Sequence, residues 1–599
     1  MNAAGTARGR RTTRLQWLAL LLLLLLAVVL RIPSFWEPIG SDQAISALIA
    51  DSLRQGKVFY RDVWDHHTPL EFTIHALAQV LLGSSTRTVY LLDLLWTLAS
   101  GIAIYGLARR LYGHATALLG TGLYLLFGNS AAFNQDTIGT WTMRFKPEGL
   151  ATLPFAVGVY GLLRAAERDE PRPVVWWGLA GIALGLATAL KPPAAIFLIA
   201  AWLVALMVAF RAPGEERGMR VAASVRATLW LAGGALLAQL TYLVPVLAQA
   251  TLREFWQAVV VYNFGPYAEL GLSSSRFLIV SALIGKETLG LWLLALAALA
   301  HMVWRDRRLG NWLIVGWGVL AGAMLVLQDR YFSYQYMPLL PPLCLLAAYG
   351  VVQLWRAAGS RSVRLATWLA RALVVGAVVG AMMLLWDRYF SVQALPWLPP
   401  AVLLAALAVV LLWRLAGRWS AGPATWFARA AVVALLAANL TQFATTNALT
   451  YGRFISFAGG HMDSDAFYAA FNTYPRHYSY PADRAVADWV RQRTGPDDQL
   501  GTLGGYGATP VYLSGRAPAS RYVFTYHLFH KSIADHPMVE AMREQLLADL
   551  VASRPAYIVL FRPLEEFERF TALYGWLTAN YELEKEFIHG RSLYRRISS

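Results

Sequence analysis

Apolar blocks of about twenty residues recur along this chain from Leu15 to about Asn447, and this repetition constrains its fold more than any other feature. A helix of that length crosses the roughly 30 Å hydrocarbon core of a bilayer. The chain is 57% hydrophobic and only 15% charged, which agrees with a protein that lies largely in lipid. The sequence therefore predicts a polytopic α-helical membrane protein with about thirteen spans. The expected spans are 15–32, 88–108, 114–129, 148–164, 174–190, 194–211, 226–249, 288–304, 311–328, 336–356, 364–386, 396–416 and 425–447.

Charge and cysteine content narrow the class of protein. The formal net charge is +16, and a membrane protein usually holds such an excess of Lys and Arg in its cytoplasmic loops. Nucleic acid is therefore not expected as a partner. The single cysteine, Cys344, excludes a disulfide framework and a cysteine-built metal site. The basic stretch RGRRTTR precedes the first span without a small-x-small cleavage site, which predicts an uncleaved signal anchor with a cytoplasmic N-terminus. A composition rich in Arg, Ala, Leu and Trp favours the plasma (inner) membrane of a bacterium.

Residues 70–82 are apolar but reach only ~20 Å as a helix, which is too short to span. They begin like a surface helix, because Thr68 can serve as N-cap, Pro69 suits the first helical position and Glu71 completes a capping box. Gly83 can end the helix. Placing this helix on the surface keeps the Arg-rich loops cytoplasmic, as the positive-inside rule requires, whereas a span here would export them. The segments expected outside are then 33–87, 130–147, 250–287, 329–335, 387–395 and 448–599.

The first exported segment is expected to hold a second surface helix before residue 56. Ser41 can cap it and Gly56 can end it. Its apolar residues recur at helical spacing on one face. They are Ile45, Leu48, Ile49 and Leu53.

The composition changes after residue 447, where Leu and Ala give way to Asp, Tyr, His and Arg. DRAVADWVRQRTGPDD reads as an amphipathic helix, and QLGTLG, PAYIVLF and EKEFIHGRSLYRRI read as strands. Helices are expected at about 538–552 and 563–576. The sequence therefore predicts a membrane domain over 1–447 and a small exported α/β domain over 448–599. The C-terminal segment carries no Gly-rich phosphate loop, nucleophile elbow or metal-ligand spacing.

Two candidate chemical sites lie in the first exported segment. Asp42 begins a helix, where the helix dipole alone would favour an acid, but it could also act as a general base. The stretch WDHHTPL carries His66 and His67. Adjacent histidines could bind a metal, although neighbouring residues on a loop seldom chelate one ion, and an imidazole could equally contact a phosphate.

Two further candidates lie in later exported segments. Asp136, Arg144, Lys146 and Glu148 precede or open the span 148–164, where they either snorkel and pair with the helix dipole or face the same cavity as Asp42.

The stretch QDRYFSYQYMPLLPP is either an ordinary interfacial anchor or a clamp on an anionic lipid headgroup. Its candidate residues are Arg330, Tyr331, Tyr334 and Tyr336. Lys191 lies near the outer end of its span and can snorkel or reach a phosphate.

In combination these features resemble the GT-C superfamily of membrane glycosyltransferases. The similarity is greatest to the branch that includes lipid A aminoarabinose transferase and the protein O-mannosyltransferases. The shared elements are an acid after the first span (SDQ), a G-x-x-Y-like element (GKVFY), a Lys-Pro-Pro-Leu-like motif (HTPL) and an exported acid before the fourth span. The Arg/Tyr–Pro element (DRYFSYQYMPLLPP) and an exported C-terminal domain complete the pattern.

The resemblance implies a cell-envelope enzyme that takes a hexose or pentose from a polyprenyl-phosphate-linked donor. The acceptor would be a hydroxyl of a lipid, glycan or protein, and transfer would invert the anomeric carbon. Asp42 would match the family's catalytic aspartate, and Glu148 or Asp136 its second exported acid. Expected ligands of the donor phosphate are His67, Lys191, Arg330 and Arg144. Expected substrate-binding residues are His66, Tyr60, Tyr331 and Tyr334.

The chain departs from the family pattern at two positions. His67 stands where lysine is usual, so phosphate contact there would depend on pH. Gln43 replaces the second acid of the common pair, which weakens the case for a bound cation. We therefore expect no metal site and no obligatory cofactor, with a divalent cation as the alternative.

Two other functions fit the same architecture. A lipid or polysaccharide transporter or flippase would keep ionisable groups at mid-membrane, whereas the charges here cluster at one face. An inactive glycan-binding scaffold would carry the fold without the chemistry. The sequence favours the enzyme and identifies neither the sugar nor the acceptor.

Overall fold

The structure is a computed structural model that describes residues 3–128, 144–210, 216–270, 274–358, 451–469 and 479–597, with single positions at 429, 430, 433, 448, 450 and 471. Three predicted spans, 364–386, 396–416 and 425–447, and the expected exported segment 387–395 lie outside the described ranges. Asp136 also lies outside them.

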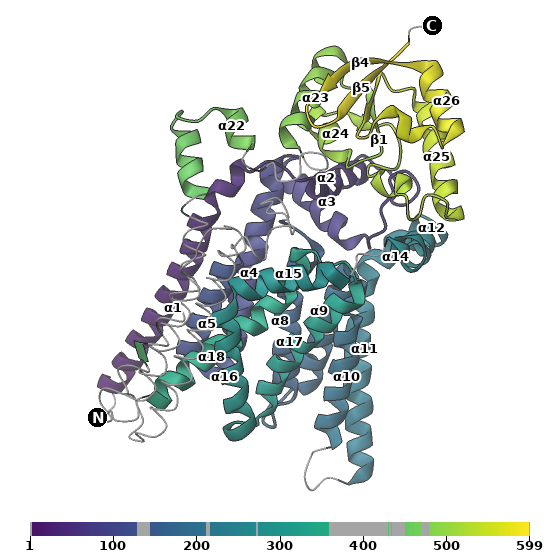
Figure 1. Cartoon of the computed structure of the whole chain (residues 1–599). Helices are drawn as coiled ribbons and strands as arrows, with labels where there is room; N and C mark the ends of the chain where they lie inside the picture. The colour runs from purple at the N-terminus through teal and green to yellow at the C-terminus, as the bar shows by residue number, and fades with distance from the viewer. Residues whose placement is uncertain are drawn as a thin grey trace, which may run out of the picture.

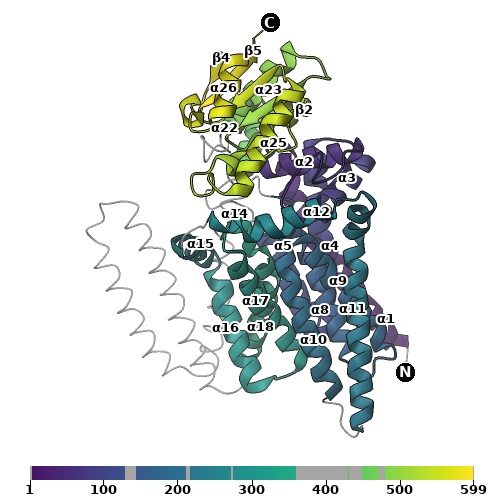
Figure 2. The same cartoon turned by 90° about the vertical axis from the view of Figure 1, so that its right-hand side faces the viewer.

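Long helices form a bundle whose axes run roughly in one direction (Figures 1 and 2). The N-terminus lies at one end of the bundle, and the C-terminal sheet lies at the other (Figure 1). Within the described residues, seven helices are long and apolar enough to cross a membrane, and eight if one bent pair, α15 and α16, counts as a span. A multi-pass membrane protein is confirmed, and the number thirteen stays a prediction. The bundle helices are α1 (Ala3–Arg31), α4 (Thr86–Tyr112), α5 (His114–Phe127), α8 (Thr152–Ala165), α9 (Pro173–Leu190), α10 (Ala195–Phe210), α11 (Arg217–Ala248), α16 (Leu289–Arg305), α17 (Leu309–Gln328) and α18 (Leu340–Ala358). Helix α15 (Ser274–Glu287) is bent by 83° from α16 and lies across the bundle (Figure 1).

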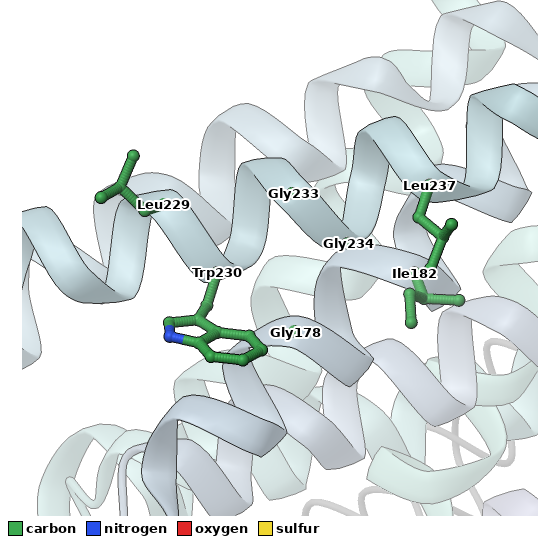
Figure 3. Close-up of a pocket in the computed structure, with 7 residues that line it drawn as sticks. All are labelled: Gly178, Ile182, Leu229, Trp230, Gly233, Gly234 and Leu237. Atoms are coloured by element: carbon green, nitrogen blue, oxygen red, sulfur yellow. The ribbon is translucent and has the colours of Figure 1, made fainter.

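Helices α9 and α11 approach each other closely through small residues. A Cβ added at Gly181 would lie 2.1 Å from the carbonyl oxygen of Leu231, and one added at Gly234 would lie 2.2 Å from that of Gly178. Only glycine therefore allows the two backbones to approach this closely, as is common in membrane helix pairs. Beside this contact lies an apolar hollow (Figure 3). It is lined by Gly178, Ile182, Leu229, Trp230, Gly233, Gly234 and Leu237, and these side chains offer no titratable group.

Two short helices lie between the bundle and the C-terminal sheet (Figure 1). They are α2 (Ser41–Arg54) and α3 (Leu70–Leu82), so residues 70–82 form a separate short helix, as predicted. The apolar stripe of α2 is buried at Ile45, Leu48 and Ile49. This stripe belongs to the same apolar cluster as residues of the C-terminal segment, so part of its packing is supplied by that segment rather than by lipid.

The predicted N-terminal caps of these two helices are wrong, whereas Gly83 ends α3 and Gly56 follows the end of α2, as predicted. Gly40 is the N-cap of α2, and the Ser41 hydroxyl makes no capping bond. The Thr68 hydroxyl donates to the carbonyl of Ala189 at 2.6 Å, and Glu71 accepts a hydrogen bond from Ser46 at 2.8 Å. Tertiary partners have therefore taken the side chains that local rules assign to the helix end.

The C-terminal residues form a five-stranded sheet in the order β2-β1-β3-β5-β4. Strands β2, β1 and β3 are parallel, and β5 runs antiparallel to both β3 and β4. The predicted terminal strand 584–597 is instead a hairpin, because His589 and Gly590 adopt left-handed conformations and reverse the chain. The strands are β1 (Gln499–Leu503), β2 (Ala517–Pro518), β3 (Tyr557–Leu560), β4 (Tyr581–Phe587) and β5 (Arg591–Arg596).

Helices pack around the sheet, and short elements connect the chain elsewhere. The helices near the sheet are α23 (Tyr480–Arg493), α24 (Ala508–Ser514), α25 (Pro537–Ser553) and α26 (Thr571–Asn580). The short elements are η1 (Ile32–Trp36), α7 (Pro147–Leu150), η2 (Pro192–Ala194), α12 (Leu252–Trp256), η3 (Gln257–Val261), α13 (Tyr262–Phe264), α14 (Pro266–Glu269), η4 (Ser333–Leu339), α22 (Ser464–Ala469), η5 (Tyr526–Phe529) and η6 (Leu564–Phe567).

Trp64 joins the first exported segment to the C-terminal segment. Its backbone N–H donates to the carbonyl of Arg521 at 2.9 Å. Its ring stacks on His527 at 5.5 Å and meets Tyr262 edge-on at 5.1 Å. The C-terminal segment therefore holds the loop that precedes α3 through these contacts with Trp64.

Candidate functional site

Asp42 and Lys146 form an ion pair at the end of the bundle that carries the C-terminal sheet. The Lys146 ammonium lies 2.6 Å from an Asp42 carboxylate oxygen, and their side chains are 12% and 19% exposed. Lys146 also lies 5.0 Å from the centre of the Tyr334 ring. Burial lowers the pKa of Lys146, but the charges of Asp42, Glu71 and Glu148 outweigh it and raise the pKa well above its usual value. Lys146 therefore stays charged at physiological pH.

Sequence reasoning placed Lys146 in a candidate cluster but gave it no role in the reaction. The two partners are 104 residues apart, so no local pattern could have paired them.

The backbone beside Lys146 is held by three contacts. The Gln43 side chain donates to the carbonyl of Arg144 at 2.7 Å, and the Phe145 N–H donates to Asp93 at 2.8 Å. Asp93 is itself paired with Arg31. Gln43 thus positions the segment that bears Lys146.

Arg144 pairs with Glu37 rather than standing free for a phosphate. Two nitrogens of its guanidinium donate to the two oxygens of Glu37, each at 2.8 Å. The side chains are 5% and 1% exposed. Arg144 therefore holds the 144–146 segment in this structure. Its third nitrogen, Nη1, has no partner among the described residues, and contact with a donor phosphate stays a prediction.

The change Arg144→Met is expected to lower the free energy of unfolding by about 3–5 kcal/mol, because it leaves the buried Glu37 carboxylate unpaired. Thermal unfolding of the detergent-solubilised protein measures this loss. Glu37→Gln should destabilise the protein as well, since both changes break one pair. A stable Arg144→Met protein that has lost only donor binding would restore the predicted phosphate role.

Glu148 and Lys191 form the second ion pair at this end of the bundle. Their charged atoms lie 2.8 Å apart, with Glu148 fully buried and Lys191 14% exposed. Glu148 lies in α7, and Lys191 directly follows α9. The structure thus brings these two predicted residues together.

Glu71 is a buried acid that the sequence identified only as part of a helix cap. Its carboxylate accepts from Ser46, which follows Asp42 by one turn of α2. Burial raises the pKa of Glu71, although the charges of Lys146 and His67 oppose this.

Asp65, His66 and His67 form a compact group on the loop before α3. The Nδ1 atom of His67 lies 2.6 Å from the Asp65 carboxylate, which also accepts from the His67 backbone N–H. Burial alone would raise the pKa of Asp65, but the charge and hydrogen bond of His67 hold it well below its usual value. Their ligand atoms all lie within 4.8 Å of one another, so these residues could hold a divalent cation.

Tyr60, Tyr262 and Tyr267 surround this group. The Tyr60 hydroxyl donates to the carbonyl of His67 at 2.8 Å, and the rings of His66 and Tyr267 lie 4.5 Å apart. His66 and Tyr60 therefore serve the loop itself in this structure, and substrate contact by either residue stays a prediction.

His527 reaches the same group from the C-terminal segment and was not predicted. It is 1% exposed, and neither ring nitrogen has a hydrogen-bond partner among the described residues. Burial lowers the pKa of His527 to about 3, so the imidazole is neutral. No sequence signal could have linked it to Asp65, because the contact depends on how the C-terminal segment docks.

The Arg330 guanidinium lies 4.3 Å from the centre of the Tyr267 ring, which belongs to α14. One nitrogen donates to the carbonyl of Tyr267. The other two, Nε and Nη1, have no partner within the described ranges, although the side chain is 6% exposed. Such buried donors are normally satisfied, so this guanidinium is suited to an anion.

The aromatic residues that follow Arg330 pack on each other and on α15. Tyr334 stacks on Phe332 at 5.4 Å, and Tyr331 meets Phe277 of α15 at 4.9 Å. Of the two predicted aromatic ligands, only Tyr334 is recorded in contact with a charged group of the site, Lys146.

The chain is similar to a known protein family and to several solved structures. Residues 66–231 match the family model described as dolichyl-phosphate-mannose-protein mannosyltransferase. No curated protein sequence matches the chain significantly. Among solved structures, ArnT from Cupriavidus metallidurans in the apo state aligns with a TM-score of 0.55 and 15% identity over 98% of each chain.

Two further structures give similar alignments. ArnT from Cupriavidus metallidurans bound to undecaprenyl phosphate has a TM-score of 0.51 at 15% identity and covers 97% of this chain and 98% of its own. The oligosaccharyltransferase AglB from Archaeoglobus fulgidus, in complex with an inhibitory peptide and a dolichol-phosphate, has a TM-score of 0.45 at 12% identity, over 98% of this chain and 74% of its own. The chain thus shares the fold of ArnT over nearly its whole length, and its resemblance to the GT-C membrane glycosyltransferases is confirmed.

Proposed function

We propose that the protein is a membrane glycosyltransferase that moves a sugar from a polyprenyl-phosphate-linked donor to a hydroxyl acceptor on the exported side. The observation that carries the proposal is the partly exposed Asp42 carboxylate, which lies at one end of the bundle with the cations Lys146, Lys191 and Arg330. A carboxylate can accept a proton from a hydroxyl, and nearby cations can stabilise a phosphate. The family model and the shared fold support the same reaction class.

The proposed reaction is a single displacement with inversion. The acceptor oxygen attacks the anomeric carbon while its proton passes to Asp42. The bond between that carbon and the phosphate oxygen breaks, and its electron pair leaves with polyprenyl phosphate. Lys191 and Arg330 stabilise the charge that develops on the leaving phosphate. Glu148 holds Lys191, and its own contact with substrate stays a prediction, as does that of Asp136.

We propose that no resident metal is obligatory, because the leaving phosphate already faces protein cations. A divalent cation held by Asp65, His66 and His67 would supply further positive charge beside this loop. Turnover that survives chelation, measured before and after treatment with EDTA, supports this part of the proposal.

The orientation is proposed on the same basis. Helix α2, which carries Asp42, lies at the end of the bundle opposite the N-terminus (Figure 1). The Arg-rich loops predict that the N-terminal end is cytoplasmic. The site and the domain from residue 448 onward would then be exported, in a bacterial plasma membrane.

The test is made with the full chain in proteoliposomes that contain a panel of polyprenyl-phosphate sugars and hydroxyl acceptors. Release of polyprenyl phosphate and appearance of sugar on the acceptor are both measured. Turnover of one donor is expected. Movement of a donor across the bilayer without sugar transfer would instead identify a flippase, and binding with neither would identify a scaffold.

A further inference from the structure

The base assigned above is engaged by a cation in this structure. At 2.6 Å, the Lys146 ammonium donates directly to the Asp42 carboxylate. An ion pair of this kind stabilises the ionised carboxylate and so weakens its ability to take a proton. Asp42 therefore needs to lose this partner before it can act on a hydroxyl.

The lysines at this end of the bundle differ in how costly it would be to leave their partner carboxylates unpaired. Moving Lys191 would leave Glu148, which is fully buried, without its charge partner. Leaving a buried charge unpaired typically costs about 3–5 kcal/mol. Asp42 is 19% exposed, so water can solvate it when Lys146 moves, and the cost is correspondingly smaller.

The two other predicted phosphate ligands are also held in place. His67, at the position of the family lysine, is bound to Asp65 through both its ring and its backbone. Arg330 is fixed on Tyr267, although two of its nitrogens can still donate.

The backbone around Lys146 is fixed, whereas its side chain can change conformation. Its backbone neighbours are fixed by Gln43 and Asp93, whereas its side chain has four rotatable bonds and lies beside the Tyr334 ring. Glu71 and Glu148 also contribute negative charge around it, so Asp42 is not its only source of electrostatic stabilisation.

We propose that Lys146 exchanges partners during the reaction. In the free protein it pairs with Asp42, and when the lipid-linked donor arrives it moves to the donor phosphate and releases the Asp42 carboxylate for the acceptor. Donor binding thereby frees the base. This inference rests on the proposed function, because it gives Lys146 a place in the same site.

The exchange makes a prediction that a merely structural ion pair does not. Since Asp42 and the phosphate compete for one ammonium, Asp42→Asn should tighten binding of undecaprenyl phosphate roughly 10-fold. Lys146→Met should weaken that binding roughly 10-fold. In the Lys146→Met background the Asp42→Asn change should have no effect, because the competition is gone.

The experiment measures the Kd of undecaprenyl phosphate for the full chain in nanodiscs, for wild type, both single variants and the double variant. Lys146→Arg, which keeps the charge, should retain the competition. Lys57→Met controls for the loss of one positive charge, since Lys57 lies in segment 33–87, which carries Asp42. Thermal unfolding identifies any variant that has lost its fold. If Lys146→Met does not fold, the Kd values of Asp42→Asn and Lys146→Arg are enough to test the exchange. Binding that Asp42→Asn leaves unchanged or weakens would overturn the exchange.

Failure of the proposed function is separable from failure of the exchange. The binding cycle needs no sugar transfer, whereas the proteoliposome assay needs turnover. The tenfold competition without turnover would support the exchange and contradict the enzyme. Turnover without the competition would overturn the exchange, while the proposed enzymatic function would still be supported.

Discussion

Asp42→Asn is expected to lower kcat for sugar transfer by at least 100-fold, because an amide cannot accept the acceptor's proton and general-base catalysis contributes about 10²–10⁴-fold. Asparagine has nearly the same shape, and its oxygen can still accept from Lys146, so the fold should persist. Single-turnover release of polyprenyl phosphate from donor-loaded protein measures the chemical step apart from product release.

Asp51→Asn is the matched control for this prediction. Asp51 lies on the same helix, α2, but pairs with Arg54 and accepts from Ser84 at the surface. The Asp51→Asn variant should therefore have the same kcat as the wild type. Asp42→Asn activity within a few-fold of wild type would remove Asp42 from the proton transfer.

Arg330→Met should lower kcat by about 10²–10³-fold, the loss usual when one preorganised donor to a developing anion is removed. Its guanidinium is already buried beside Tyr267 with two donors unsatisfied among the described residues, so it needs no reorganisation to meet a phosphate. If the contact strengthens as the phosphate leaves, kcat and kcat/KM fall together, and steady-state kinetics over a range of donor concentrations show this.

Arg253→Met controls for this substitution, since Arg253 is an exposed arginine on α12, in a different segment expected outside, 250–287. Its kinetics should match the wild type. A rise in KM with kcat unchanged for Arg330→Met would mean that Arg330 only holds the donor.

Patterns along the sequence predicted the described bundle helices and the separate short helix α3, because lipid exposure imposes length and composition on each segment independently. The surface position of α3 stays a prediction. The charged residues assigned to one side by this logic do meet at one end of the bundle. Local rules failed where tertiary contacts compete. Thr68 and Glu71 match a capping box, yet Thr68 donates to a carbonyl of α9 and Glu71 accepts from Ser46 instead.

The pairings within the site were beyond the reach of sequence reasoning. Asp42 with Lys146 and Arg144 with Glu37 each join residues more than 100 positions apart. Composition shows that such charges need partners, but which partner each one takes depends on how α2, α7 and the first loop pack together. His527 is the extreme case, because it comes from a segment with no predicted site at all.

The interlocked glycines of α9 and α11 have a mechanical consequence for Lys191. Because the two backbones touch at Gly181 and Gly234, neither helix can slide along the other without a collision of main-chain atoms. We therefore expect α9 and α11 to move together as one rigid unit. Lys191 directly follows the last residue of α9, and Pro192 prevents the helix from continuing. The helix pair would thus fix the position of the Lys191 ammonium along the bundle axis. A donor whose phosphate is confined to one level of the bilayer would then meet positive charge at that same level.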